Sequence, residues 1–279
     1  IGEKNVITLD MGGTSTDIAL LENYENRFTA NGEIGSFPIK VQMVEMHTIG
    51  SGGGSIAWID YGGALRVGPQ SAGAVPGPAC YNIGGNKPTV TDANLLLGRI
   101  NSKYFLGGEK LLSYEKAKLV VEKEIGNNLK LSYVVSANGI LSVLFSDMSG
   151  GVKVISEQKG YDLREFSLIA FGGAGPLHAY QLMNELDMKK IIVPLSPGNF
   201  SATGELFAEI KYDYVQTHIV PIEKLSFEEY NQIFEQIMAA AVEDLTKEKF
   251  EREDIIFRGT ADMRYSGQAW ELNINVPIK

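Results

Sequence analysis

The first third of the chain alternates short apolar runs with glycine-tipped turns, a pattern typical of paired β-strands. Asn5 to Leu9 and Asp17 to Leu21 are apolar and β-prone, and Asp10 to Thr14 between them predicts the turn of a hairpin. A second hairpin turn is predicted at Tyr61-Gly62-Gly63. The other strands expected in this part of the chain cover residues 27–33, 39–47, 55–60 and 64–68.

Helical periodicity dominates the middle of the chain. The segment 131–157 is apolar on nearly every side, so we expect a buried helix there. The proline- and glycine-rich stretch 71–88 predicts a long loop. Thr91 or Asp92 is placed to cap the helix that follows, with a ligand-binding carboxylate as the alternative for Asp92. The remaining predicted helices cover residues 113–125, 176–186, 201–210 and 226–249.

Strand, helix and strand follow one another between residues 166 and 193. This order implies two parallel strands joined by a right-handed crossover. Together with the hairpins, it predicts an α/β fold with a mixed sheet flanked by helices. Further strands are expected at 212–220 and 255–276, the second stretch turning at Ser266-Gly267 and carrying a half-buried strand.

The order of these elements predicts two regions. The first covers residues 1–222 and contains an insertion at about 61–130. The second, 223–279, holds a long helix and a β-hairpin, the start of a carboxyl-terminal β region.

Composition excludes several classes of protein. The chain has 25 Lys and Arg and 34 Asp and Glu, so its net charge is −9. An acidic chain repels the phosphates of nucleic acids, and this one has no stripe of basic residues, so we expect no nucleic-acid partner. The single cysteine, Cys80, permits no intrachain disulfide and fits a reducing, cytoplasmic location. We expect no membrane partner, because charged residues and glycines interrupt the longest apolar run, 140–155.

The strongest candidate site follows the first strand, at Asp10-Met11-Gly12-Gly13-Thr14-Ser15-Thr16-Asp17. Amides at such a glycine turn converge on an anion, and the hydroxyls of Thr14, Ser15 and Thr16 add donors. Asp10 would repel a bare phosphate, so its carboxylate indicates an intervening Mg²⁺, usually held through water. The turn therefore predicts phosphate binding, with a plain hydroxyl-capped hairpin as the alternative. No Gly-Lys-Ser/Thr triplet exists, which excludes a Walker P-loop.

A second candidate site, Phe171 to His178, follows an apolar strand and opens a helix. His178 occupies the third glycine position of a dinucleotide motif, and the next strand ends at Pro194 rather than at an acid, which argues against a Rossmann site. The turn can instead lay its backbone against the face of a nucleoside, with plain strand-to-helix packing as the alternative. The residues expected at the nucleoside are Gly172, Gly173, Ala174 and Gly175.

Two further features carry possible chemistry. Four glycines among residues 50–54 predict a mobile hinge or a flap over the ligand, with Gly52 and Gly53 near the cofactor; a wide bulge is the alternative. The histidines form no metal-spaced pair. His47, two residues from Glu45 on a predicted strand, is the best candidate for acid/base catalysis, with a structural or solvated role as the alternative.

Asp10 to Asp17 resembles the second glycine-rich phosphate motif of the hydantoinase A/5-oxoprolinase family. Six further segments resemble that family in the same order over nearly the whole chain, which makes the joint match specific. They are Gly50 to Ala57, Gly68 to Ala74, Pro76 to Tyr81, Pro88 to Asn94, Phe171 to Ala179 and Pro197 to Ala202.

The resemblance implies a ribonuclease-H-like lobe of an actin-like ATPase, with ATP and Mg²⁺ as cofactors and a small cyclic amide as substrate. It implies that ATP phosphorylates the amide before the ring opens. Asp10 would hold the Mg²⁺ water, and Asp17 would orient the loop or the attacking group. An ATP-binding subunit of an acetone-type carboxylase and a nucleotide-responsive interaction module without turnover remain alternatives.

One feature of the family is missing from this sequence. Its members carry an earlier Asp-x-Gly-Gly-Thr-Phe-Thr-Asp motif, whereas this chain has a single motif of that kind. The chain also begins at Ile1 rather than Met, with a predicted strand within four residues. We therefore expect a fragment that covers the second half of a longer protein. It would need the N-terminal half and a hydantoinase B-like subunit, and would be inactive alone.

Overall fold

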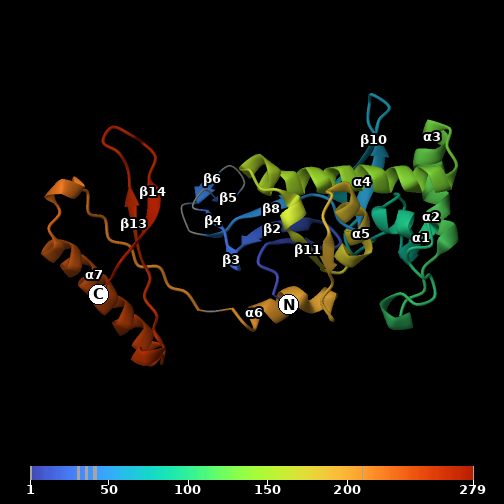
Figure 1. Cartoon of the computed structure of the whole chain (residues 1–279). Helices are drawn as coiled ribbons and strands as arrows, with labels where there is room; N and C mark the ends of the chain where they lie inside the picture. Colours follow the sequence, from blue (N-terminus) through green and yellow to red (C-terminus); the bar gives the residue numbers. More distant parts are fainter. Residues whose placement is uncertain (1, 30–31, 35–36, 40–42, 209, 279) are drawn as a thin grey trace. The chain divides into compact units, whose positions relative to one another are not determined.

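The computed structural model describes residues 2–29, 32–34, 37–39, 43–208 and 210–278. The chain divides into two compact units, Ile1–Phe207 and Ala208–Lys279 (Figure 1). The expected boundary at residue 222 falls inside the second of these units.

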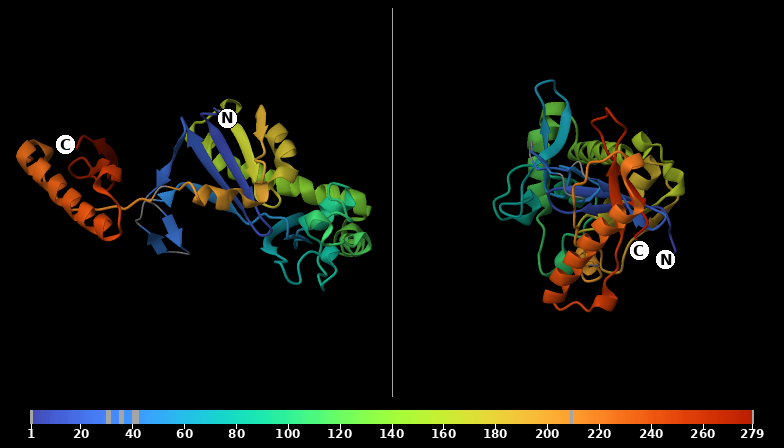
Figure 2. Two further views of the ribbon diagram at one scale, coloured as in Figure 1. Left: turned by 90° about the horizontal axis from the view of Figure 1, so that it is seen from below. Right: turned by 90° about the vertical axis from the view of Figure 1, so that its left-hand side faces the viewer.

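A six-stranded mixed sheet is the framework of the first unit (Figure 2), with β12-β11-β1-β2-β3 in order and β8 also paired with β2. β1 (Val6–Met11) is antiparallel to β2 (Thr16–Glu22) and parallel to β11 (Ser167–Phe171). β11 is parallel to β12 (Lys190–Ile192), so the first hairpin, the strand-helix-strand unit and the mixed α/β class are confirmed. The remaining strands of the sheet are β3 (Glu25–Asn26) and β8 (Met46–Ile49).

One face of this sheet is closed by two helices, α4 (Tyr133–Ile155) and α5 (Gly175–Glu185). Leu9 and Ile18 on this face are fully buried. A Cβ on Gly151 of α4 would lie 3.0 Å from Cδ1 of Ile18, so the helix comes close to the strands at this glycine. The predicted buried apolar helix is therefore confirmed.

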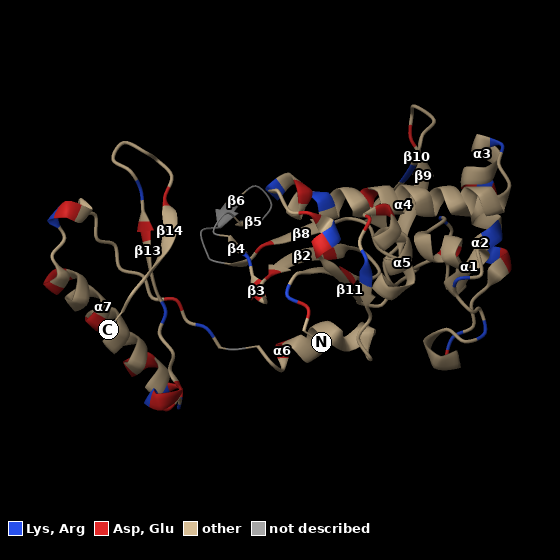
Figure 3. Ribbon diagram, in the orientation of Figure 1, with Lys and Arg blue, Asp and Glu red and all other residues tan. Residues whose placement is uncertain are grey.

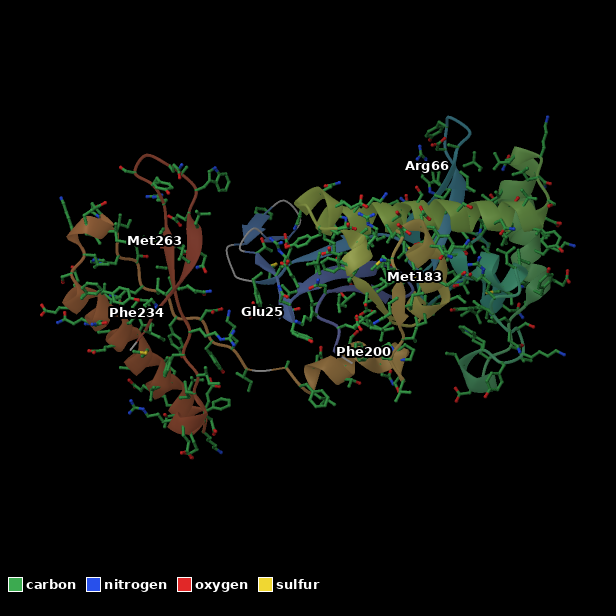
Figure 4. All side chains as sticks on the ribbon, in the orientation of Figure 1. Glu25, Arg66, Met183, Phe200, Phe234 and Met263 are labelled. Atoms are coloured by element: carbon green, nitrogen blue, oxygen red, sulfur yellow. The ribbon has the colours of Figure 1, made fainter. Side chains whose placement is uncertain are left out.

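The opposite face is less covered. Asp10, Asp17 and Phe171 lie on it, each partly exposed. The short helix α6 (Phe200–Glu205) covers part of this face, where Phe200 (labelled in Figure 4) meets Phe171 with ring centroids 5.1 Å apart. In Figure 1, α4 and α6 lie on opposite sides of the strands. The sheet thus has one sealed apolar face and one face that carries carboxylates.

The segment between β8 and α4 adds a hairpin and two main helices. β9 (Ser55–Ile59) and β10 (Leu65–Ser71) form the predicted second hairpin. Ser113 caps α2 (Tyr114–Val121), as predicted. Short helical turns make up much of the rest of the unit: η1 (Ala79–Tyr81), η2 (Leu106–Gly108), the π-helix η3 (Glu122–Gly126), α3 (Asn127–Leu129), η4 (Glu157–Lys159), η5 (Leu163–Glu165) and η6 (Pro197–Asn199).

The helix α1 (Val90–Leu96) begins earlier than expected, because Thr89 is its N-cap. Asp92 completes a capping box: its carboxylate accepts from the amide of Thr89 at 3.0 Å and from that of Cys80 at 2.7 Å. Asp92 is fully buried, and burial raises the pKa of its carboxyl. Asp92 therefore ties the 76–81 loop to α1 instead of binding a ligand.

The strands predicted at 27–33 and 39–47 are only partly described, because residues 30, 31 and 40–42 lie outside the described residues. Met46 and His47 begin β8, which pairs with β2 in the sheet, so the end of the second prediction is confirmed. The other described strand residues form two short pairs rather than long strands. These are β4 (Phe28–Thr29) with β7 (Met43–Val44), and β5 (Gly32–Ile34) with β6 (Phe37–Ile39).

The second unit holds α7 (Phe227–Lys247), capped by Ser226, and the antiparallel pair β13 (Gly259–Met263) and β14 (Leu272–Val276). The strand predicted at 212–220 is wrong: those residues form no helix or strand. The strand predicted near the end of the chain is present as β14, but it is not half-buried as predicted, because Leu272 is 66% exposed. Two helical turns, η7 (Ile222–Lys224) and η8 (Arg252–Asp254), complete the unit.

Charged side chains are interspersed along α2, whereas acidic ones predominate on α7 (Figure 3). Lys247, in the last turn of α7, pairs with Glu243 at 2.8 Å and with Asp244 at 3.5 Å. Such exposed pairs contribute little to stability, because solvent screens them. They fit a solvated helix face.

By length and composition alone, one helix of the described chain could cross a membrane, Tyr133–Lys159, which comprises α4 and the turn after it. This helix packs against α1, α5, β2 and β8 of its own unit. Buried core helices of globular proteins have the same composition. We therefore describe it as the core helix of the first unit.

His178 predicts a pH dependence of stability. It is fully buried in α5, its Nε2 lies 3.4 Å from Nδ2 of Asn94, and burial lowers its pKa to about 4. The imidazole of His178 takes up a proton near pH 6.5 in the unfolded chain but resists protonation in the folded protein. The free energy of unfolding therefore decreases as the pH falls from about 6.5 toward 4. Between pH 7 and pH 5 this group alone should lower the unfolding free energy by about 2 kcal/mol.

The measurement is urea unfolding of the protein and of His178→Gln at both pH values. The variant should lose about 2 kcal/mol less than the wild type over this interval, because glutamine does not titrate. Equal losses in the two proteins would contradict the assignment.

Candidate functional site

Two carboxylates lie side by side on the less covered face of the sheet. Asp10 at the end of β1 is directly opposite Asp17 in the β1–β2 pair, and Asp17 is opposite Thr48 of β8. Residues directly opposite on antiparallel strands share a face. The Thr48 hydroxyl donates a 2.6 Å hydrogen bond to Oδ1 of Asp17. The structure thus brings Asp10 and Asp17 together, next to the predicted phosphate turn.

The turn between β1 and β2 has free donors. The amide of Gly12 donates to the carbonyl of Ser15 at 3.1 Å, which closes the turn. The amides of Gly13, Thr14 and Ser15, all within the described chain, donate to no protein acceptor. A Cβ on Gly12 or Gly13 would meet no atom within 4 Å, so open space adjoins them. Free amides in a turn that has open space at Gly12 and Gly13 are suited to holding an anion.

The hydroxyls of the turn have different roles. Thr14 is exposed, and its hydroxyl lies 3.3 Å from that of Ser71, the last residue of β10. Thr16 is fully buried and donates to the carbonyl of Ser51 at 2.5 Å. The Thr16 hydroxyl therefore anchors the neighbouring segment, and this geometry favours an anchoring role over the predicted role as a phosphate donor.

The glycines of residues 50–54 lie directly behind this turn. The amide of Gly53 donates to the carbonyl of Gly12 at 3.0 Å, and that of Gly54 to the carbonyl of Gly13 at 2.6 Å. A Cβ on Gly52 would lie 2.6 Å from the amide nitrogen of Thr14. Gly52 and Gly53 are buried with their amides already paired. This packing favours a structural support for the turn over the predicted mobile hinge or flap.

The Gly172–Gly175 turn adjoins the same carboxylate. Gly172 has φ +79°, and a Cβ there would collide with the Asp10 carboxylate and lie 2.5 Å from the carbonyl oxygen of Met11. Gly175 is buried against the carbonyl of Leu9. Close packing of strand and helix therefore accounts for both glycines. Gly173 is exposed beside open space, so it is the glycine of this turn that a ligand could approach.

The three glycine-rich segments meet at one point. A Cβ on Gly53 would lie 3.8 Å from the carbonyl oxygen of Gly12 and 3.9 Å from Cβ of Ala174. The amide of Ala174 also donates to the carbonyl of Met11 at 2.9 Å. Segments far apart in the sequence are thus joined around the end of β1, where Asp10 lies.

His47 is placed away from the two carboxylates. It is opposite Ile18 in the β2–β8 pair and therefore lies on the sealed face of the sheet. Its ring packs toward α4, where a Cβ on Gly151 would lie 3.5 Å from Cδ2. The structure does not bring His47 to Asp10 or Asp17, so the geometry favours its structural reading over the predicted catalytic one.

Ser201 is a site residue that the sequence reasoning did not single out. Its hydroxyl donates to Oδ2 of Asp10 at 2.6 Å from the first turn of α6. The preceding residues hold α6 in place, since the amide of Gly172 donates to the carbonyl of Pro197 at 2.8 Å. Ser201 lies within Pro197 to Ala202, one of the segments that resemble the family, so the sequence did mark this region. No pattern in the neighbouring residues indicated that it contacts Asp10.

The donors of the site fit Mg²⁺. Magnesium is usually held by one or two carboxylates together with phosphate oxygens and waters, without a cage of protein ligands. Asp10 provides such a carboxylate beside the free amides of the turn. In the described part of the chain, no group of three or more His, Cys, Asp or Glu forms a fuller metal cage. The arrangement therefore suits a metal that arrives with a phosphate.

Comparisons with known proteins agree over the full length of the chain. The family model described as Hydantoinase/oxoprolinase matches residues 1–214, and the model described as Hydantoinase/oxoprolinase C-terminal domain matches residues 223–279. Caprolactamase subunit alpha of Pseudomonas jessenii is 36% identical, the match covering 99% of this chain and 40% of the relative. Acetophenone carboxylase gamma subunit of Aromatoleum aromaticum is 36% identical, with 100% and 39% covered.

Solved structures agree with these matches. The structure of the ATP-dependent caprolactamase from Pseudomonas jessenii superimposes with a TM-score of 0.82 at 36% identity, covering 99% of this chain and 40% of that one. Nucleotide-free acetone carboxylase gives a TM-score of 0.82 at 27% identity, with the same coverage. The chain spans about 40% of the length of these relatives. It belongs to the hydantoinase/oxoprolinase family.

Proposed function

We propose that the chain is the nucleotide-binding part of an ATP-dependent hydrolase that activates a small cyclic amide by phosphorylation and then opens its ring. The observation that carries the proposal is the free-amide turn of Gly13 to Ser15 beside Asp10, backed by the two other glycine segments. Its similarity to an ATP-dependent caprolactamase supports the substrate class.

Each residue of the site has a distinct task in this proposal. The amides of Gly13, Thr14 and Ser15 hold the terminal phosphates of ATP. Asp10 holds Mg²⁺, which when bound neutralises charge on the β- and γ-phosphates. Gly173 leaves room for the nucleoside. Asp17, fixed by Thr48, orients the acceptor.

The proposed reaction has three steps. The amide oxygen of the substrate attacks the γ-phosphorus, a new oxygen–phosphorus bond forms, and the bond to the β–γ bridging oxygen breaks to release ADP. Water then adds to the activated carbon, and cleavage of the carbon–nitrogen bond opens the ring and leaves an acyl phosphate. A second water hydrolyses the acyl phosphate to the carboxylate and free phosphate. We propose that the rest of the longer protein and a hydantoinase B-like subunit supply the base for the second step.

A second candidate function is the ATP-using subunit of a carboxylase. The observation in its favour is that an acetophenone carboxylase subunit is as similar to this chain as the caprolactamase subunit, at 36% identity each. The same phosphate turn would then serve phosphorylation of a ketone or of bicarbonate. The two functions differ in the molecule that accepts the phosphoryl group, whereas the nucleotide site is the same in both.

The test is phosphate release by the full-length protein with its co-purified subunits, in the presence of ATP and Mg²⁺. Release stimulated by 5-oxoproline, hydantoin or caprolactam, with ring-opened product, supports the hydrolase. Release that requires a ketone and bicarbonate supports the carboxylase. Nucleotide binding with no release under any of these conditions would contradict both and favour an interaction module.

Gly13→Ala gives a prediction at the nucleotide site itself. A methyl group there meets no protein atom within 4 Å, so the unfolding free energy should stay within about 0.5 kcal/mol of the wild type. The methyl group occupies the space proposed for phosphate, so ATP affinity measured by calorimetry should fall on the order of tenfold. A matched Gly52→Ala should instead destabilise the protein, because its methyl group meets the backbone of Thr14. Unchanged ATP affinity in stable Gly13→Ala would contradict the site.

A further inference from the structure

We infer that Ser201 is a positioning residue for the Asp10 carboxylate, an assignment that rests on the proposed nucleotide site. The hydroxyl of Ser201 donates to Oδ2 of Asp10 at 2.6 Å. This is the length of a charge-assisted bond between a hydroxyl and a carboxylate, which is stronger than a bond between neutral groups.

The helix that carries Ser201 is fixed at the end of β11. Phe200, the neighbouring residue, packs edge-on against Phe171, at an interplanar angle of 66°. One turn earlier, the carbonyl of Pro197 accepts from the amide of Gly172 at 2.8 Å. These two contacts involve the last residue of β11 and the residue that follows it, next to β1, so they hold the Ser201 hydroxyl beside Asp10.

The other oxygen of Asp10 is confined as well. A Cβ on Gly172 would collide with Oδ1, so the backbone of this glycine lies against that side of the carboxylate. Ser201 at Oδ2 and Gly172 at Oδ1 together limit rotation of the carboxylate plane. A carboxylate that holds a metal through water depends on such orientation, and loss of an orienting hydrogen bond typically costs 10–100-fold in metal affinity.

The assignment is specific to one hydroxyl of α6. Thr203 lies two residues further along the helix, and its hydroxyl donates to the backbone carbonyl of Asn199 at 3.0 Å. It is bound within its own helix, whereas the Ser201 hydroxyl is bound to Asp10. Thr203→Val is therefore a matched control for removal of a hydroxyl from α6.

The experiment measures Mn²⁺ binding by electron paramagnetic resonance in the full-length protein saturated with ADP. Ser201→Ala should weaken Mn²⁺ binding at least tenfold, Ser201→Thr should restore most of it, and Thr203→Val should leave it unchanged. ADP affinity in the presence of a chelator should be the same in Ser201→Ala as in the wild type. Thermal unfolding of each variant identifies any general loss of the fold.

Asp10→Asn, measured in parallel, separates this inference from the proposed function. If Asp10→Asn leaves Mn²⁺ binding unchanged, the proposed metal site is wrong and the role of Ser201 falls with it. If Asp10→Asn weakens binding and Ser201→Ala does not, only the role of Ser201 is overturned. The role of Ser201 would also be overturned if Ser201→Ala lowered the affinity for ADP equally with and without metal, because the hydroxyl would then act on the nucleotide.

Discussion

Asp10→Asn is expected to lower ATP turnover by about a hundredfold or more while the fold stays intact. Asparagine has nearly the same shape, and its amide oxygen can still accept the hydrogen bond from Ser201. Only the negative charge beside the free amides of Gly13 to Ser15 is removed. Without it, the proposed Mg²⁺ loses its protein ligand and the charge on the phosphates is poorly balanced.

The measurement is phosphate release by the full-length protein over a range of Mg²⁺ concentrations. The variant should need more metal to reach its half-maximal rate. Asp17→Asn is the matched control, since Asp17 lies opposite Asp10 on the same face and is bound by Thr48. It should lower the maximal rate while leaving the Mg²⁺ dependence unchanged. If Asp10→Asn shows the wild-type Mg²⁺ dependence, Asp10 is not the metal ligand.

Gly172→Ala should have the largest effect on stability among the site substitutions. Gly172 has φ +79°, a conformation that costs other residues about 1–2 kcal/mol. The added methyl group would also collide with the Asp10 carboxylate and the carbonyl of Met11. We expect the unfolding free energy to fall by about 2–4 kcal/mol and ATP turnover to be lost, because the end of β1 must move.

Gly173→Ala is the control for this substitution. The neighbouring glycine lacks a positive φ, and its Cβ would meet no atom within 4 Å. Its unfolding free energy, measured by urea titration, should stay within about 0.5 kcal/mol of the wild type. Similar stability losses in the two variants would mean that the turn as a whole tolerates no side chain. The specific contact with Asp10 would then not explain Gly172.

Local sequence patterns were sufficient for the framework of the first unit. The hairpin that ends in Asp10 and the unit from β11 to β12 have strong turn signals between apolar runs, and both were predicted with small errors at their ends. The buried α4 was readable because it is apolar all round. The turn proposed to bind phosphate was located from the order of Asp10, two glycines and three hydroxyl residues.

Contacts between residues far apart in the sequence could not be predicted from such local patterns. A strand places alternate residues on opposite faces, so His47 could be assigned to a face only once β8 was paired with β2. The glycines of residues 50–54 suggested mobility, yet at Gly52 a side chain is excluded by contact with the Thr14 backbone. Ser201 reaches Asp10 across 191 positions of sequence, and no local pattern reports such a contact.

The second unit shows the same difficulty in another form. Alternating residues predicted a half-buried strand in the tail, and the strand is present as β14. Its apolar residues Leu272 and Ile274 are nevertheless exposed, at 66% and 43%. Alternation predicts which residues share a face, but burial depends on what packs against that face.

The most direct test of the nucleotide site is a crystal structure of the full-length protein with Mg²⁺ and a non-hydrolysable ATP analogue. We expect the β- and γ-phosphates within about 3 Å of the amides of Gly13, Thr14 and Ser15. The metal should lie between them and Asp10. A triphosphate bound elsewhere, with these three amides still facing solvent, would contradict the assignment of the β1–β2 turn as the phosphate site.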